Sequence, residues 1–248
     1  MLFLHKATGS MTLKKQLRRY RDSFYSYKKN VEREISRSRL KDRDFTIISN
    51  NCWGSEVYRD LGLPYQTPFV GLFLFAPCYI QLLNNLKFYL EGELNFKEFS
   101  RYELANQKRE KGIWALYPIG LLGDDVEIHF MHYSSDSEAR EKWFRRLKRI
   151  HWDTENIFLK FCDRGLCTEQ LIAEFDQLNF SQKVCFTSKN YPDFKSAVWV
   201  KECRNAPYVV DGSSLYRVSR EYFDVIDWLN GGSGHVKITQ KIFNRVLL

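Results

Sequence analysis

Apolar and polar positions alternate along the first 40 residues with the period of a helix. Within residues 12–40, apolar side chains recur at spacings of three and four, which predicts one continuous helical stripe. The stripe consists of Leu13, Leu17, Tyr20, Phe24, Tyr27, Val31 and Ile35. Lysines and arginines fill the other faces, so this segment is predicted to be a basic amphipathic helix.

From residue 44 the pattern changes to short apolar runs separated by helical stretches. Residues 45–49 predict a buried strand, and further strands are expected at residues 67–75, 113–122, 126–132, 157–161, 184–187 and 197–200. Helices are expected at residues 53–60, 77–90, 136–150, 168–178 and 219–229. This alternation predicts an α/β fold, a layered sheet with helices on its faces, in addition to the N-terminal helix.

Three segments follow from this division of the chain. Residues 1–43 are predicted to form a basic helical arm, residues 44–232 an α/β domain, and residues 233–248 a C-terminal extension. The net charge of +8 is concentrated in the arm, which holds 13 Lys and Arg against four Asp and Glu, while the remainder holds 25 against 26. Because the domain is nearly neutral, nucleic acid is not the expected partner. The arm is expected either to pack on protein or to lie on an anionic membrane surface through residues 12–40.

Cysteine usage indicates the compartment. The six cysteines form no CxxC pair and have irregular spacing, so neither a disulfide framework nor a zinc site is predicted. No apolar stretch approaches the ~20 residues of a spanning helix, and residues 1–4 are too short for a signal-peptide core. A cytoplasmic protein is expected, with the arm able to hold it at the inner membrane.

The stretch ISNNCWGSE, residues 48–56, is the principal candidate for chemistry. Ligands of open α/β sheets bind beyond the carboxyl ends of strands, where Asn50, Asn51, Cys52 and Trp53 are expected to lie. A helix starting after Cys52 would lower the pKa of its thiol, and the asparagine amides could bind an oxyanion or sugar hydroxyls. The alternative is an ordinary turn around a buried thiol, since asparagine favours turns and cysteine packs as a small hydrophobe.

Two histidines are candidate bases for Cys52. His129 lies within a predicted strand and His132 at its end, which makes His132 the better candidate. Their spacing of three points the two rings to opposite faces, so no metal site is predicted. Either histidine could instead have a structural role. Arg146 and Arg149 could bind the phosphates of a donor substrate, or could belong to a solvated helix face.

Several of these residues together resemble an uncharacterised bacterial family often labelled as exopolysaccharide biosynthesis proteins. The resemblance spans about residues 44–230 and is carried by Ser-Asn-Asn-Cys-Trp-Gly at residues 49–54, Thr67-Pro68, Gly71-Leu72, His132-Tyr133, Ala139, Trp143, Arg146 and Arg149. It implies work on cell-surface glycans, without an established reaction, and it favours a ligand site at residues 50–53 over an accidental turn.

The leading hypothesis is a transferase of cell-surface polysaccharide or lipopolysaccharide biosynthesis. Acyl transfer through Cys52, with His132 or His129 as the base, is its most concrete form. Glycosyl transfer and a non-catalytic role in glycan binding or assembly are the alternatives. The expected partners are a glycan and an activated-sugar or acyl donor, and the cofactor remains open.

Overall fold

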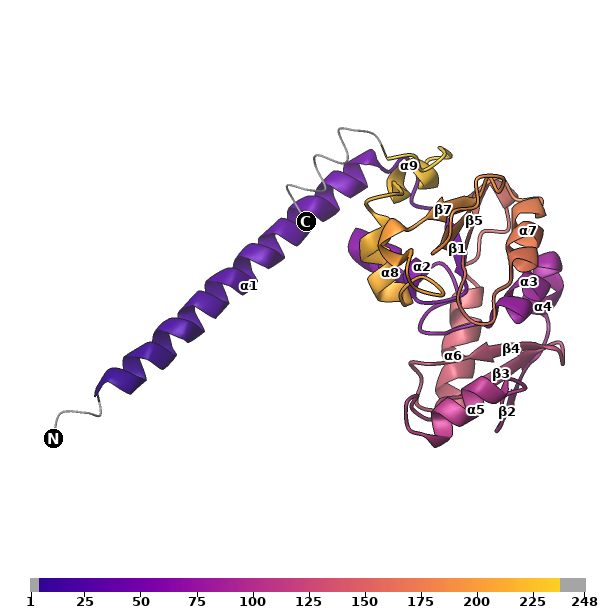
Figure 1. The fold of residues 1–248 in the computed structure, drawn as a ribbon, viewed down its shortest axis with the longest axis horizontal. Coiled ribbons are helices and arrows are strands. Elements are labelled where there is room, and N and C mark those ends of the chain that lie inside the picture. The colour runs from indigo at the N-terminus through magenta and orange to yellow at the C-terminus, as the bar shows by residue number, and fades with distance from the viewer. Residues whose placement is uncertain (1–4, 237–248) are drawn as a thin grey trace.

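A four-stranded parallel sheet forms the centre of the fold in the computed structural model, which describes residues 5–236 (Figure 1). Its strand order is β1-β5-β6-β7, with β1 (Thr46–Ser49), β5 (Ile157–Cys162), β6 (Lys183–Thr187) and β7 (Ala197–Trp199). Every residue of β1 and β5 is buried, as expected for parallel strands covered on both faces. The carboxyl ends of all four strands therefore lie at one edge of the sheet.

Helices cover both faces of this sheet. One face packs against α2 (Trp53–Leu61), α8 (Gly212–Ser219) and α9 (Val225–Leu229), and the other against α3 (Ala76–Asn84), α4 (Leu86–Glu91), α6 (Asp136–Leu147) and α7 (Glu169–Gln177) (Figure 1). Neighbouring strand residues serve opposite cores: Ile47 packs with α2, whereas Ile48 packs with α3. The layered α/β fold predicted from the sequence is confirmed.

A second, antiparallel sheet extends the α3 side. It consists of β2 (Leu94–Lys97), β3 (Ile119–Leu122) and β4 (Val126–His129), with α5 (Glu103–Glu110) beside it (Figure 1). The hairpin between β3 and β4 turns at Gly123 and Asp124, whose φ angles are 54° and 65°. A tight hairpin of this kind requires positive φ at both positions, which Gly-Asp tolerates. Two 3₁₀ turns, Thr154–Asn156 and Lys201–Cys203, precede β5 and follow β7.

Several expected elements differ from the structure. The strands expected at 113–122 and 126–132 are shorter, because β3 begins at Ile119 and β4 ends at His129. Residues 67–75 form no strand, because the left-handed Gly71 breaks the run and only Phe73 makes a single bridge, to His129. The expected helix at 77–90 is divided into α3 and α4 at Asn85, whose φ and ψ are −143° and 54°. The expected helix at 219–229 is replaced by α8 and α9, because Asp211 and Asp224 each cap a new helix N-terminus.

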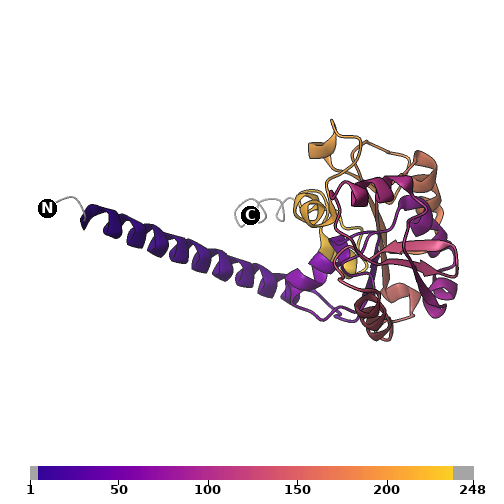
Figure 2. The ribbon, with the colours of Figure 1, turned by 90° about the horizontal axis from the view of Figure 1, so that it is seen from below.

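The long helix α1 (His5–Arg39) projects away from the domain, which it joins at its C-terminal end (Figures 1 and 2). Arg33 Nε donates to the Asp60 carbonyl at 3.0 Å, and Arg37 donates to those of Leu61 and Gly62 at 2.6 and 2.8 Å. These guanidinium groups bind the carbonyls at the C-terminal end of α2, where the helix dipole is negative. No helix within residues 5–236 has the length and apolar character needed to cross a membrane. Residues 1–4 of the predicted arm and residues 237–248 of the predicted C-terminal extension lie outside the described residues.

Candidate functional site

A cavity of about 470 Å³ opens where the carboxyl ends of β1 and β5 approach the end of β4. Asn51 and Cys52 follow β1, residues 163–167 follow β5, and Met131 and His132 follow β4. Residues 72–75 and 207–212 complete the walls, together with side chains from α5 and from the loop after it. The volume is in the range of small-molecule sites, and the position is where parallel α/β sheets bind ligands.

Cys52 is one of two half-buried thiols that line this cavity, and it stands at the N-cap of α2. Its carbonyl accepts the Glu56 N–H at 3.2 Å, which starts the helix. The helix N-terminus was expected to lower the pKa of the thiol, but burial raises it, and the nearby Lys160 ammonium offsets only part of this effect. The thiol is therefore protonated at neutral pH, and its reaction as a nucleophile requires a base.

His132 lines the same cavity as Cys52, and both contact Gly71. The His132 N–H donates to the Gly71 carbonyl at 3.0 Å, while a backbone hydrogen bond from Gly71 favours the thiolate form of Cys52. Gly71 has a φ of +69°, and a Cβ there would lie 3.2 Å from the Cβ of His132. A glycine is therefore required for this close approach, which places a thiol and an imidazole in one cavity.

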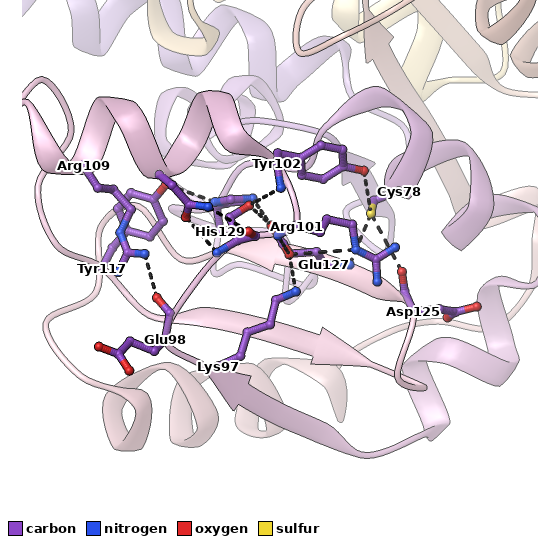
Figure 3. A network of polar contacts seen from close by, with 12 residues as sticks. Cys78, Lys97, Glu98, Arg101, Tyr102, Arg109, Tyr117, Asp125, Glu127 and His129 are labelled. Carbon is purple, nitrogen blue, oxygen red and sulfur yellow. Dashed lines mark hydrogen bonds and ion pairs between the residues drawn. The ribbon is translucent and has the colours of Figure 1, made fainter.

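His129, the other predicted base, is fully buried behind Phe73 and Phe75, whose rings line the cavity. Its Nε2 lies 2.8 Å from Glu127 Oε1, and its Nδ1 lies 3.0 Å from the Tyr117 hydroxyl (Figure 3). Burial lowers the pKa of His129, so the ring is neutral at pH 7. Both ring nitrogens face groups of this network and not the cavity, and His132 is the predicted base that lines the cavity.

Glu127 is the centre of that network (Figure 3). Its fully buried carboxylate accepts the Arg101 N–H at 2.9 Å, lies 2.6 Å from Lys97 Nζ, and also accepts the Ser100 hydroxyl. Burial by itself raises the pKa of this carboxyl, but the donors from His129, Arg101, Lys97 and Ser100 outweigh it and lower the pKa to about 2. The network anchors β4 and thereby the start of the segment that carries His132.

Glu127→Gln is expected to destabilise the fold by about 3 kcal/mol at pH 7, since each pKa unit corresponds to about 1.4 kcal/mol. Because the pKa is lower in the folded than in the unfolded chain, this stabilisation is complete above the unfolded value of 4.5 and is lost as pH falls towards about 2. Urea unfolding across this pH range should show that the difference in free energy of unfolding between wild type and Glu127→Gln decreases as the pH falls. Glu93→Gln, at an exposed position, serves as a control and should change the free energy of unfolding by less than about 0.5 kcal/mol. A stability difference between wild type and Glu127→Gln that does not change with pH would contradict the lowered pKa of Glu127.

Beneath the cavity floor lies a polar cluster made by Asn50, Asn51, Lys160 and Cys162. Lys160 is fully buried, and its ammonium donates to Asn50 Oδ1 at 3.2 Å and to Asn51 Oδ1 at 2.9 Å. The two amide nitrogens donate in turn to Cys162 Sγ at 3.5 and 3.3 Å. Burial lowers the pKa of Lys160, because its partners are neutral amides and a thiol. The sequence did not identify this lysine, although it interrupts the apolar strand IFLKFC.

The cluster determines which asparagine reaches a ligand. Asn51 lines the cavity, and its Oδ1 also accepts the Trp53 N–H at 3.1 Å, which satisfies the first N–H group of α2. Asn50 has no exposed surface and contacts Lys160 and Cys162 instead. Of the two amides predicted to bind substrate, Asn51 is therefore the one placed to do so.

The remaining predicted substrate residues lie outside the cavity. Trp53 is buried in the core, where its Nε1 donates to Ser219 Oγ at 3.1 Å. Arg146 donates to the Tyr133 hydroxyl at 2.6 Å, and Arg149 to the Tyr65 carbonyl at 3.2 Å. Trp53 therefore has a packing role, and the two arginines join α6 and the residues after it to neighbouring loops.

Two other cations occupy the cavity instead, and each lies over an aromatic ring. Lys108 Nζ is 4.5 Å from the centre of the Trp114 ring, and the Arg164 guanidinium is 4.6 Å from that of Tyr208. Arg164 also donates to the Val209 carbonyl at 2.7 Å, which fixes its position. Sequence reasoning missed both residues, since no local pattern distinguishes them from other surface cations.

Two acidic residues and a second helix N-terminus complete the site. Asp163 accepts the N–H groups of Ser188 and Val209 at 2.7 and 2.8 Å, which ties the end of β5 to β6 and to residues 207–212. Asp211 caps α8, and Gly212 packs so closely on α2 that a Cβ there would lie 2.9 Å from the Cys52 nitrogen. The N-termini of α2 and α8 thus meet at the cavity, a geometry that favours anionic or hydroxyl-rich groups. Within residues 5–236, no group of three or more His, Cys, Asp or Glu side chains is arranged to hold a metal ion.

Comparison with known proteins places most of this chain in one family. Residues 23–230 match the family described as "Domain of unknown function (DUF1919)". An uncharacterised protein of Haemophilus influenzae is 38% identical over 208 residues, which cover 81% of this chain and 90% of that protein. The family match begins within α1 and includes the segments that form the cavity.

Proposed function

This chain belongs to the DUF1919 family, and from the cavity that it forms we propose that it is a transferase of cell-surface polysaccharide or lipopolysaccharide biosynthesis. The observation that carries the proposal is that Cys52 and His132, from distant parts of the sequence, line one cavity at the carboxyl ends of the parallel strands. The glycan context is supported by the resemblance of residues 49–54 and 132–149 to proteins labelled as exopolysaccharide biosynthesis proteins. Six free cysteines support a reducing compartment, so we place the protein in the cytoplasm.

Acyl transfer through Cys52 is the reaction that this pair supports best. His132 removes the proton from Cys52 Sγ, and the thiolate attacks the carbonyl carbon of the acyl donor. The Asn51 amide, which lines the cavity with the thiol, is a candidate donor to the developing oxyanion. The donor's leaving group departs with a proton, leaving a thioester on Cys52. A glycan hydroxyl then attacks that thioester, His132 accepts its proton, and the acylated glycan leaves as Cys52 is regenerated.

The cavity also favours a second candidate reaction, glycosyl transfer from a nucleotide sugar. Lys108 and Arg164 could bind a diphosphate, while Trp114 and Tyr208 offer aromatic faces to a base or sugar ring. In that reaction Cys52 would contact the substrate without forming a bond. A non-catalytic glycan-binding or assembly factor is the remaining alternative, and it would tolerate loss of the thiol but not loss of residues 1–40.

Cys52→Ala is expected to abolish glycan acylation, with a loss of about 1,000-fold or more, because no thioester can form. The measurement is the acyl content of surface polysaccharide in cells whose own gene is replaced by the variant. Intact-mass analysis of the purified protein with candidate acyl-coenzyme A donors should show an acyl adduct on wild type and none on Cys52→Ala.

Cys167→Ala is the matched control, since Cys167 is a half-buried cysteine of the same cavity. It should retain the adduct and most of the activity. Unchanged glycan acylation in folded Cys52→Ala would exclude the nucleophile. Nucleotide-sugar binding that persists in Cys52→Ala would instead favour glycosyl transfer.

A further inference from the structure

The outer part of α1 carries an apolar face at a distance from the α/β domain (Figures 1 and 2). Leu13, Leu17, Tyr20 and Tyr27 share this face, with exposed fractions of 59, 60, 75 and 69%. Val31 and Ile35, further along the same stripe, are half-buried where the helix meets the domain. The stripe thus continues well beyond the part that the domain uses for packing.

Cations border this apolar face. Residues 12–30 contain seven Lys and Arg and one Asp; Arg21 is exposed directly beside the stripe, and Arg18 and Arg19 are exposed further around the helix. At 1.5 Å per residue, the face from Leu13 to Tyr27 is about 21 Å long. A long apolar face on a helix of predominantly positive charge is complementary to a surface that is apolar inside and anionic outside.

From these observations we propose that α1 binds an anionic lipid bilayer, with Leu13, Leu17, Tyr20 and Tyr27 in the boundary between headgroups and acyl chains. Tyrosine suits that boundary, because its ring is apolar and its hydroxyl remains hydrated. The arginines of this part of α1 contact lipid phosphates. This inference concerns the arm alone and holds whichever reaction the cavity performs.

A second copy of the chain fits the same face less well. The stripe has the spacing of a coiled coil, but coiled-coil interiors favour Leu, Ile and Val, whereas Tyr20 and Tyr27 would bury hydroxyl groups. Pairing two copies would also bring together two strongly basic segments, which repel each other. An anionic surface satisfies both the charge and the aromatic side chains.

The attachment of α1 gives membrane binding a structural consequence. Arg33 and Arg37 bind the C-terminal end of α2, and the opposite end of that nine-residue helix carries Cys52. The side chains of Arg33 and Arg37 therefore hold the arm to the domain through several hydrogen bonds. Binding of α1 to a bilayer would hold the cavity at a defined distance from lipid-borne acceptors.

Co-sedimentation of the full chain with lipid vesicles tests the proposal. We expect binding to vesicles of phosphatidylcholine containing about one third phosphatidylglycerol, weak binding to phosphatidylcholine alone, and release as salt is raised. The triple variant Arg18→Gln/Arg19→Gln/Arg21→Gln should bind about 100-fold more weakly, because each cation near an anionic surface contributes about five-fold. Leu17→Ser/Tyr20→Ser/Tyr27→Ser, which keeps every charge, should also lose binding.

A matched control removes the same charge from the domain. Lys87→Gln/Lys111→Gln/Lys195→Gln changes three exposed lysines outside α1 and should bind vesicles within about two-fold of wild type. Equal binding to neutral and anionic vesicles, or no binding to either, would overturn the proposal. A different outcome would also overturn it. In that outcome the wild type is a dimer in analytical ultracentrifugation and does not bind vesicles, and the Leu17→Ser/Tyr20→Ser/Tyr27→Ser variant is a monomer.

Discussion

Trp53→Ala is expected to lower the free energy of unfolding by about 3–5 kcal/mol, the usual cost of deleting a fully buried aromatic side chain. The indole ring packs against Phe186, Tyr216 and Trp228, with centroid distances of 5.5, 5.7 and 6.1 Å. The substitution therefore opens a cavity between the sheet and the helices α8 and α9. Thermal unfolding followed by circular dichroism should show a melting temperature lower by about 10 °C or more.

Two controls separate packing from ligand binding at this position. Trp53→Phe keeps an aromatic ring but loses the hydrogen bond to Ser219, and should cost about 1–2 kcal/mol. Trp152→Ala, at a 40% exposed tryptophan, should change stability by no more than about 0.5 kcal/mol. A stable Trp53→Ala protein that has lost only ligand binding would restore the substrate role that the sequence predicted for Trp53.

Asn51→Leu is expected to destabilise the fold by about 3 kcal/mol, because it leaves the buried Lys160 ammonium with one amide partner fewer and removes the acceptor of the first N–H group of α2. Urea unfolding measures the loss. Burying an undersatisfied charge is costly, so the protein should respond by releasing the Lys160 proton more readily. Ligand binding in the cavity should weaken as well, since Asn51 forms part of its wall.

A double-mutant cycle with Lys160→Met tests this cause directly. Methionine has a similar length but no charge, so Asn51→Leu should cost about 2 kcal/mol less in the Lys160→Met background than in wild type. Ser181→Ala, an exposed position preceding β6, controls for background effects and should be additive with Asn51→Leu. Additive costs for Asn51 and Lys160 would show that the 2.9 Å contact between them is not a significant source of stability.

Much of the fold was predictable because burial leaves a local pattern. Strands covered on both faces appear as unbroken apolar runs, which is why β1, β5 and β6 were found at nearly their observed limits. The same criterion failed at residues 67–75, where Phe69, Leu72 and Leu74 are buried without strand pairing. An apolar run indicates burial, but whether it pairs as a strand depends on the segment that lies beside it in the fold.

The candidate site was predictable only in part. Its position beyond β1 followed from the strand before Cys52 and the helix after it, whereas His132, predicted to end its strand, lies beyond β4, which ends at His129. Lys108, Arg164 and Lys160 were missed, because a cation gains a specific role only from what surrounds it. The thiol pKa was predicted in the wrong direction, since the helix N-terminus was visible in the sequence and the burial of Cys52 was not.

Local sequence was sufficient to establish the alternation of strands and helices, the basic arm, and the turn that carries Cys52, because periodicity and capping act over a few residues. Tertiary structure decided that Asn51 faces the cavity while Asn50 and Trp53 face inward, and that His132, not His129, lines the cavity with the thiol. These choices depend on which segments meet at the edge of the sheet. Such contacts join residues far apart in the chain, so they leave no local pattern to read.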